Sequence, residues 1–315
     1  MYETDHATFW NHVNSDIPFF INRLGGSDFK TWENYMGKCI SPEEAIRTLS
    51  LWNGYYDTSH NDSSRRNNLQ LFFDQLLSVY KNNAIQLNAC NFVKYHSSFA
   101  DSVNSVSYVC YHHTCEGPNF FRTLLTNKLV HKRVLVISAF TEQIKEQERY
   151  LAQLYGIPIH TEFVYINTQI TYLNEDTDKY MNTPHSNFHE SVEHYKKLID
   201  ETAFDFALLS CGSYAHFLGE HIKNINKQSI YIGGILQLYF GIFGDLYLTP
   251  SAKWFDLNYC ALNTFRIPHS PKTLESCNSY LYNEYKYEER LRSFHYERDS
   301  GLNFTAAKIL HLINR

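Results

Sequence analysis

The chain has 315 residues, of which 43% are hydrophobic and 16% aromatic, and its formal net charge is −5 at neutral pH. This length suffices for one large α/β domain with a substantial core. The negative charge argues against a duplex-DNA binder, which needs a broad basic face. The sequence shows neither a secretory signal nor a run of 18 apolar residues, and its seven cysteines form no regular framework. We therefore expect a cytoplasmic protein without a membrane span.

The first half of the chain opens with an apolar run at residues 17–21, which predicts a strand, and a helical pattern follows at residues 29–36. The polar stretch RLGGSD, residues 23–28, lies between them. Residues 41–51 predict a helix, because Ser41 can cap it, Pro42 suits its first turn and Glu44 completes a capping box. A polar loop is expected at residues 56–68 and a second helix at residues 69–81.

The second half alternates short apolar runs with helical patterns. Such runs are typical of strands in a parallel sheet covered on both faces. The alternation predicts right-handed βαβ units in a Rossmann-like, mainly parallel α/β sheet with helices on both faces. Strands are predicted at residues 133–138, 162–166, 204–210 and 228–232, and helices at 141–154, 188–202 and 214–226.

We expect one α/β domain over residues 1–315. Its N-terminal half carries the loop at residues 23–28, and residues 130–245 supply nucleotide-binding βαβ units. Residues 246–315 are expected to form a helical or irregular C-terminal extension.

Small and polar residues follow several of these strands. In doubly wound sheets ligands bind at the carboxyl ends of the strands, so these loops predict a binding site. Gly212 and Ser213 precede a helix, whose free N–H groups and dipole favour an anion. Gly233 and Gly234 would let a ligand approach the backbone closely. Ordinary turn chemistry is the alternative for each loop taken alone.

Residues 204–244, FDFALLSCGSYAHFLGEHIKNINKQSIYIGGILQLYFGIFG, resemble a signature of bacterial and viral proteins related to GT-D-type glycosyltransferases. That signature has a strand ending in Gly-Cys-Gly-Ala-Tyr, a helix, and a strand ending in Gly-Gly before Leu-Gln-Leu-x-Phe-Gly-Ile. The stretches RVLVISAFTEQIKEQ (133–147), LWNGYYD (51–57) and RLGGSD are similar to further elements of the family. The matches are collinear over residues 19–245.

The resemblance implies a GT-D-like glycosyltransferase that depends on Mn²⁺ or Mg²⁺. Such an enzyme moves a sugar from a nucleotide sugar, here expected to be a UDP-sugar, to a glycan or other hydroxyl acceptor. Asp28 is the implied metal ligand and a catalytic residue, although the position of the family's first acid is Gly26 here and that of its final Glu is Asp28. The implied nucleotide-sugar site comprises Arg23, Gly25, Gly26, Asn53, Ser138, Gly212, Ser213, Tyr214, Gly233 and Gly234.

The chemistry of sugar transfer suits these residue types. A divalent cation can stabilise the diphosphate leaving group as a Lewis acid, and Arg23 can clamp its oxygens. Glu142, just past a strand end, is the preferred general base, and Asp57, Asp245 and His216 are alternatives. If Asp28 lies in a surface loop, Asp28→Asn should abolish metal-dependent turnover and leave the fold stable. If it caps the helix beginning near Phe29, the same change should unfold the protein.

Two other functions compete with this one. A non-catalytic relative would bind a nucleotide or glycan without turnover, which the single carboxylate at Asp28 would suit. An oxidoreductase needs Gly-x-Gly-x-x-Gly after a strand, and neither the RLGGSD stretch nor the segment at residues 211–214 supplies it. The chain also lacks the Gly-x-x-x-x-Gly-Lys-Ser/Thr sequence of a P-loop.

Several conspicuous clusters have simpler interpretations. CYHHTC, residues 110–115, offers zinc-binding atoms, but Cys90 and His96 are the nearest outside partners, so a strand or loop is preferred. The histidines at 185, 189 and 194 are expected on a solvated helix face. Cys211 is expected to pack rather than to act as a nucleophile, and the aromatic segment at residues 280–287 to be half-buried.

Overall fold

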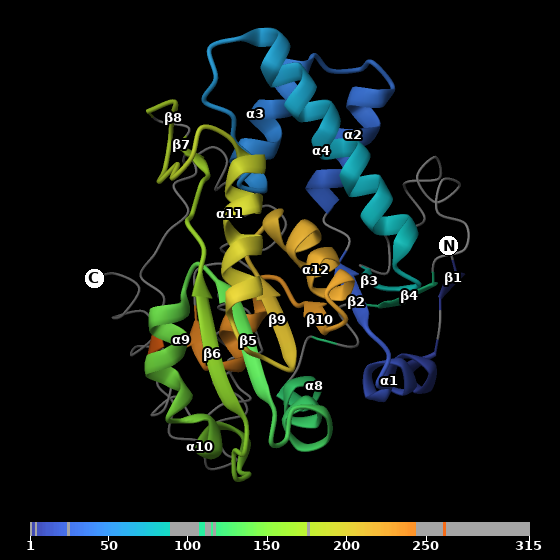
Figure 1. Cartoon of the computed structure of the whole chain (residues 1–315), viewed down its shortest axis with the longest axis vertical. Helices are drawn as coiled ribbons and strands as arrows, with labels where there is room; N and C mark the ends of the chain where they lie inside the picture. Colours follow the sequence, from blue (N-terminus) through green and yellow to red (C-terminus); the bar gives the residue numbers. More distant parts are fainter. Residues whose placement is uncertain are drawn as a thin grey trace, which may run out of the picture.

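The computed structural model describes residues 2–3, 5–23, 26–88, 107–110, 115, 118–174, 177–243 and 261–262. Its main feature is an eight-stranded sheet in the order β1-β4-β3-β2-β10-β9-β5-β6 (Figure 1). Every neighbouring pair in this sheet is parallel. Its strands are β1 (Tyr2–Glu3), β2 (Phe19–Arg23), β3 (Ile85–Asn88), β4 (Ser107–Cys110), β5 (Arg133–Ser138), β6 (Glu162–Asn167), β9 (Phe206–Ser210) and β10 (Gln228–Tyr231).

Helices cover both faces of the sheet, because successive strand residues point to opposite faces. In β5, Leu135 and Ile137 join one core, while Val134 and Val136 join the other. The first core is shared with α2 (Gly26–Met36), α3 (Pro42–Trp52), α4 (Asp62–Asn82), α11 (Phe188–Glu201) and α12 (Tyr214–Asn224). The second is shared with α1 (His6–Asn14), α8 (Pro118–Thr123), the π-helix η1 (Leu124–Lys128), α9 (Thr141–Glu148), α10 (Leu151–Tyr155) and α13 (Ile235–Tyr239). The predicted α/β fold with a parallel sheet is therefore confirmed.

Two small strand pairs lie outside the main sheet. β7 (Leu173–Asn174) pairs with β8 (Lys179–Tyr180) in antiparallel fashion, and β11 (Ile242–Phe243) pairs with β12 (Ala261–Leu262) in parallel. Most of residues 246–315 fall outside the described residues, so the single-domain boundary stays a prediction. Within the described part of the chain, no helix is long and apolar enough to cross a membrane.

The predicted strands of the second half occur within two residues of their expected positions, and β5, β9 and β10 lie inside the sheet as expected. The helices differ more. α4 begins at Asp62, so half of the predicted polar loop is helical; Asn61 caps it by accepting from the N–H groups of Ser63 and Ser64. The predicted helix at residues 141–154 is divided into α9 and α10. α2 begins at Gly26, which places Asp28 inside a helix rather than in a loop.

The helix α3 begins as its sequence predicts. Ser41 Oγ accepts from the Glu44 N–H at 3.1 Å, and the Glu44 carboxylate accepts from the Ser41 N–H at 2.8 Å. Ser41→Ala should lower the free energy of unfolding by about 0.5–2 kcal/mol, because an N–H at the helix start loses its acceptor. Urea unfolding measures this, with Ser41→Thr, which keeps the hydroxyl, as the control. An unchanged midpoint in the alanine variant would contradict the capping role.

The connections at the carboxyl edge of the sheet change faces between neighbouring strands. β2 leads into α2 and β9 into α12, both packed on the first core, whereas β10, which lies between them, leads into α13 on the second core. Neighbouring strands whose connections diverge leave a crevice between them, and this is where doubly wound folds bind ligands. The loops after β2, β10 and β9 are therefore the natural place for a site.

Candidate functional site at the carboxyl edge of β2, β10 and β9

Arg23 crosses the turn that follows β10. A Cβ atom added to Gly233, which has a φ of +72°, would lie 2.1 Å from an Arg23 guanidinium nitrogen. The guanidinium carbon also lies 6.0 Å from the ring centroid of Tyr231 on β10. The positive φ favours glycine at position 233, and the side chain of Arg23 occupies the space that a Cβ atom would need.

The turn between β9 and α12 is held against the end of α3. Gly212 has a φ of +60°, and a Cβ atom there would lie 2.9 Å from the carbonyl oxygen of Asn53. The same oxygen accepts from the Ser213 N–H at 3.1 Å. The close approach of two backbones therefore requires glycine at position 212, and it brings Asn53 beside Gly212 and Ser213.

Asp28 joins this turn from the first helical turn of α2. The residue is only 2% exposed. Its Oδ1 accepts from Ser213 Oγ at 3.0 Å, and its Oδ2 lies 3.5 Å from Nε2 of His216, a buried residue of α12. His216 Nδ1 lies 2.8 Å from Oδ1 of Asn22, which also accepts from the Arg23 N–H. Since that oxygen can only accept, Nδ1 is the donor, and the network joins β2, α2 and α12.

No protein-family model and no curated protein matches the chain. Among solved structures it is similar to one described by the words "The highly conserved domain of unknown function 1792 has a distinct glycosyltransferase fold". The two are 10% identical, with a TM-score of 0.45, and the match covers 82% of this chain and 89% of that one.

The position of Asp28 corrects two expectations. It is buried in a helix and not in a surface loop, because α2 begins at Gly26, ahead of the predicted start near Phe29. Its carboxylate also does not cap α2, since it bonds to Ser213 on another element. Asp28→Asn should therefore reduce stability, contrary to the expectation for an exposed loop acid, because a buried hydroxyl would lose a charged acceptor.

Mn²⁺ and Mg²⁺ prefer several oxygen ligands arranged around the ion. The described residues contain no group of three His, Cys, Asp or Glu side chains that could hold a metal. Asp28 is buried, and its two oxygens face Ser213 and His216. This set fits a divalent cation poorly, and the metal role of Asp28 stays a prediction.

The same side chains do not form a hydrolase triad. In such a triad the imidazole contacts the serine hydroxyl and accepts its proton. Here Ser213 Oγ contacts the carboxylate of Asp28, and it is the carboxylate that lies beside His216. The arrangement suits a rigid link between elements rather than nucleophilic attack.

The predicted general bases lie in different settings. Glu142 is exposed on the first turn of α9, which packs on the opposite face of the sheet from α2 and α12. Asp57 is buried and accepts from the Ser59 N–H and from the Asn68 amide, so its carboxylate stabilises a turn. His216 is buried within the network. Asp245 lies outside the described residues.

Other predicted site residues have local roles. Ser138 is buried at the end of β5, where its Oγ accepts from the Phe140 N–H at 3.2 Å. Gly26 is the first residue of α2, and Gly234 precedes α13. Gly25 lies outside the described residues, so its place in the site stays a prediction.

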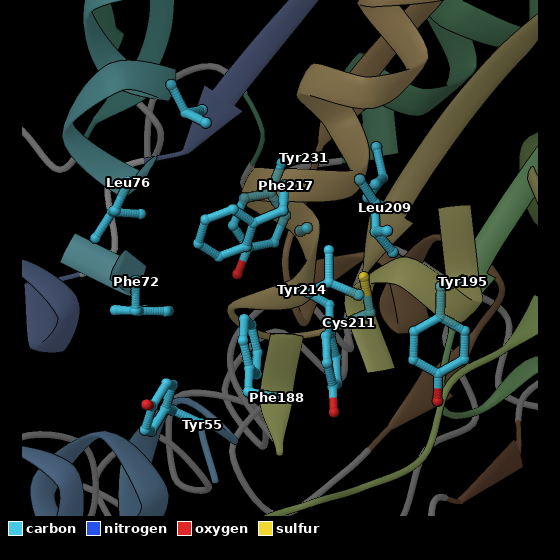
Figure 2. Close-up of a cluster of buried hydrophobic side chains, with 14 of the residues drawn as sticks. Tyr55, Phe72, Leu76, Phe188, Tyr195, Leu209, Cys211, Tyr214, Phe217 and Tyr231 are labelled. Atoms are coloured by element: carbon cyan, nitrogen blue, oxygen red, sulfur yellow. The ribbon is translucent and has the colours of Figure 1, made fainter. Parts of the chain in front are cut away.

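Tyr214 is a core residue, although its neighbours 212 and 213 lie at the edge of the sheet. Its ring stacks on that of Phe188 (Figure 2), and the ring centroids are 4.6 Å apart with an interplanar angle of 4°. Its hydroxyl lies 3.3 Å from Thr171 Oγ1. The first residue of α12 thus faces the helices of the first core, where the side chain packs rather than lining the carboxyl edge.

Cys211 lies in the same apolar cluster (Figure 2), which agrees with its expected packing role. Burial raises the pKa of its thiol far above the usual value. Iodoacetamide at pH 8 should therefore modify exposed Cys39 and leave Cys211 intact in the folded protein, because only the thiolate reacts. Peptide mass spectrometry checks this, and both residues should react in urea. Equal labelling of the two in the folded state would contradict it.

The histidine-rich segment also has structural partners. His185 Nδ1 lies 2.8 Å from Ser191 Oγ, and His189 Nε2 lies 2.8 Å from the Asn68 carbonyl oxygen. The central residues of CYHHTC, with Cys90 and His96, lie outside the described residues, as does the aromatic segment at 280–287.

Sequence reasoning missed two residues near the site. Asn22 is a polar residue near the end of an otherwise apolar strand, which was a usable signal. Tyr172 lies in the loop after β6, and its hydroxyl oxygen is 3.8 Å from the point that a Cβ on Gly212 would occupy. Thr171 fixes that loop by donating to the Gly54 carbonyl oxygen at 2.5 Å. The rule that selected the other carboxyl-edge loops applies equally to this one.

Proposed function

We propose that this protein is a glycosyltransferase that binds a nucleotide-sugar donor at the carboxyl edge of β2, β10 and β9. One observation carries the proposal: polar and glycine residues from distant parts of the chain meet at the carboxyl edge of these strands. Asp28 and Ser213, which bond to each other, are separated by 185 residues, and Asn22 and His216 by 194. Nothing local in the sequence requires this meeting.

The reaction leaves negative charge on the diphosphate as the sugar departs. The guanidinium of Arg23 has a planar fork of donors that matches phosphate oxygens, and it lies beside Gly233 in the turn that follows β10. In the proposal Arg23 stabilises the leaving group, because a fixed positive charge acts where charge develops. Glu142 is the proposed proton acceptor for the acceptor hydroxyl, since its exposed carboxylate follows the end of β5, the strand next to β9.

A panel of UDP, GDP, CMP and dTDP sugars tests the proposal by thermal shift, with and without Mn²⁺. A ligand present at 100 times its Kd stabilises the folded state by about 2.7 kcal/mol, so one donor class should raise the melting temperature by several degrees. The same donor should then release its nucleoside phosphate during incubation with the protein and a glycan mixture. A panel with no shift in either condition would refute nucleotide-sugar binding.

The second candidate is a non-catalytic nucleotide- or glycan-binding protein. The observation that favours it is the engagement of Asp28 with Ser213 and His216, which leaves the predicted catalytic carboxylate buried. The two functions differ in turnover: a binding protein would give the thermal shift without releasing nucleoside phosphate. Fold alone does not separate them, because function resides in the site.

A further inference from the structure

The structure brings together, at the start of α12, two groups for which the sequence predicts separate binding roles. The N-terminus of this helix was expected to bind an anion from the ligand, and Asp28 was expected to bind a cation. Ser213 precedes α12, and its hydroxyl makes no bond within the helix. It donates instead to the carboxylate of Asp28 at 3.0 Å. A negative group of the protein itself therefore lies at the positive end of the helix.

A second acceptor lies at the same helix end. The Ser213 N–H, one of those expected to meet phosphate, donates to the carbonyl oxygen of Asn53 at 3.1 Å. A helix N-terminus carries a partial charge of about +0.5, which a nearby carboxylate offsets. Both Asp28 and Asn53 are buried. The chain thus supplies at the start of α12 the acceptors that a bound anion would otherwise provide.

We propose that Asp28 is the internal counter-anion of α12 and a positioning residue, and that the diphosphate binds to Arg23 where it crosses Gly233. The identity of the ligand rests on the proposed function, whereas the role of Asp28 rests on the contacts alone. In this arrangement the anion binds between β2 and β10, and the β9–α12 turn forms one wall held by Asp28, Ser213 and Asn53.

The absence of a side chain at Gly233 allows Arg23 to occupy its position. A methyl group at this residue would lie 2.1 Å from the guanidinium nitrogen, 3.0 Å from the guanidinium carbon and 3.4 Å from Cδ. These contacts run along the side chain, so the whole end of Arg23 would have to move. Gly233→Ala therefore displaces the positive charge without removing it.

Two consequences follow for binding. Diphosphate should bind without a cation at Asp28, because that carboxylate is bonded to the start of α12. The carboxylate of Asp28 is bonded to Ser213 and carries negative charge at this turn. Removing that charge should therefore not weaken the binding of an anion. A metal ligand would behave in the opposite way.

Inorganic pyrophosphate is the probe for the anion site, titrated calorimetrically into the full chain with EDTA or with Mn²⁺. We expect wild-type binding in EDTA, a loss of about tenfold or more in affinity for Gly233→Ala, and no loss for Gly156→Ala. Gly156 is the matched control, because its φ of +61° imposes the same backbone strain with no atom within 4 Å of an added Cβ. Equal affinities in Gly233→Ala and Gly156→Ala would overturn the Arg23 site.

Asp28→Asn tests the counter-anion directly. It should bind pyrophosphate in EDTA at least as tightly as wild type, with a melting temperature lower by about 3–10 °C. Wild-type binding that requires Mn²⁺ and is lost in Asp28→Asn would overturn the proposal in favour of a metal ligand.

Ser213→Ala provides a test that does not depend on Asp28→Asn folding. It should lower the melting temperature, and its effect should be less than additive with that of Asp28→Asn, because one variant removes the Ser213–Asp28 hydrogen bond and the other weakens the same bond. Fully additive effects, or no effect of Ser213→Ala, would refute the role of Asp28. If wild-type protein binds neither pyrophosphate nor UDP, the proposed function fails, and these melting temperatures still decide the role of Asp28.

Discussion

Replacement of Arg23 by glutamine is expected to lower donor turnover by about 100- to 1,000-fold. The side chain extends from the end of β2 across Gly233 and lies near Tyr231 on β10. Glutamine keeps hydrogen-bonding capacity but removes the charge that opposes the developing charge of the diphosphate. The loss should appear in kcat as well as in kcat/KM, because this charge is greatest in the transition state.

Two variants complete the Arg23 experiment. Arg23→Lys keeps the charge and loses the planar fork, so it should retain part of the activity. Arg47→Gln is the control, because Arg47 forms an exposed ion pair with Asp178 and its loss should leave turnover near wild type. Steady-state release of nucleoside diphosphate measures all three. Wild-type kcat in Arg23→Gln would eliminate this arginine from the reaction.

Gly219→Ala is expected to lower the free energy of unfolding by about 1–3 kcal/mol, and by more if the neighbouring strand cannot move. Gly219 lies in α12, where a Cβ atom would come within 2.2–2.5 Å of three ring atoms of Phe20 on β2. In an exposed helix the same change would stabilise by about 1 kcal/mol. A measured loss of stability would therefore be due to the close packing of α12 against β2.

The Phe20→Leu background tests the cause of that loss. Leucine removes the ring atoms that the new methyl group would meet, so Gly219→Ala should cost less in Phe20→Leu than in wild type. Urea unfolding of the four proteins gives the coupling energy. A stabilising effect of Gly219→Ala in the wild-type background would show that α12 stands further from β2 than the structure places it.

The features that were predictable from the sequence are those that depend only on residues close together in the chain. The central strands were recognisable as apolar runs that end at small or polar residues, and the capping box at Ser41 involves only residues 41 and 44. The start of α4 was missed because its first turn is polar and exposed, so it lacks the apolar periodicity that marks a helix. The start of α2 was missed for a similar reason, since glycine and serine open it.

The contacts that the site residues make could not be predicted from the sequence, for a different reason. A strand end predicts that its loop lies at the carboxyl edge, and this placed Arg23, Gly212 and Gly233 in the same region. It does not say that Asp28 turns toward Ser213 instead of toward a ligand, because that depends on a helix packed from the other half of the chain. Gly233 was expected to allow the close approach of a ligand, and the structure places the side chain of Arg23 beside it.

The position of β10 between β2 and β9 also fixes when the site can exist during synthesis. β2 is made near the beginning of the chain. It is connected to β9 through the sheet only when residues 228–231, which form β10, pair with both strands. Until then β2 and β9 each present an unpaired edge, and unpaired strand edges promote association between chains. The edge of β2 must therefore stay protected while residues 24–227 are made, whereas the edge of β9 waits only for residues 211–227, and the arrival of one short strand closes both edges.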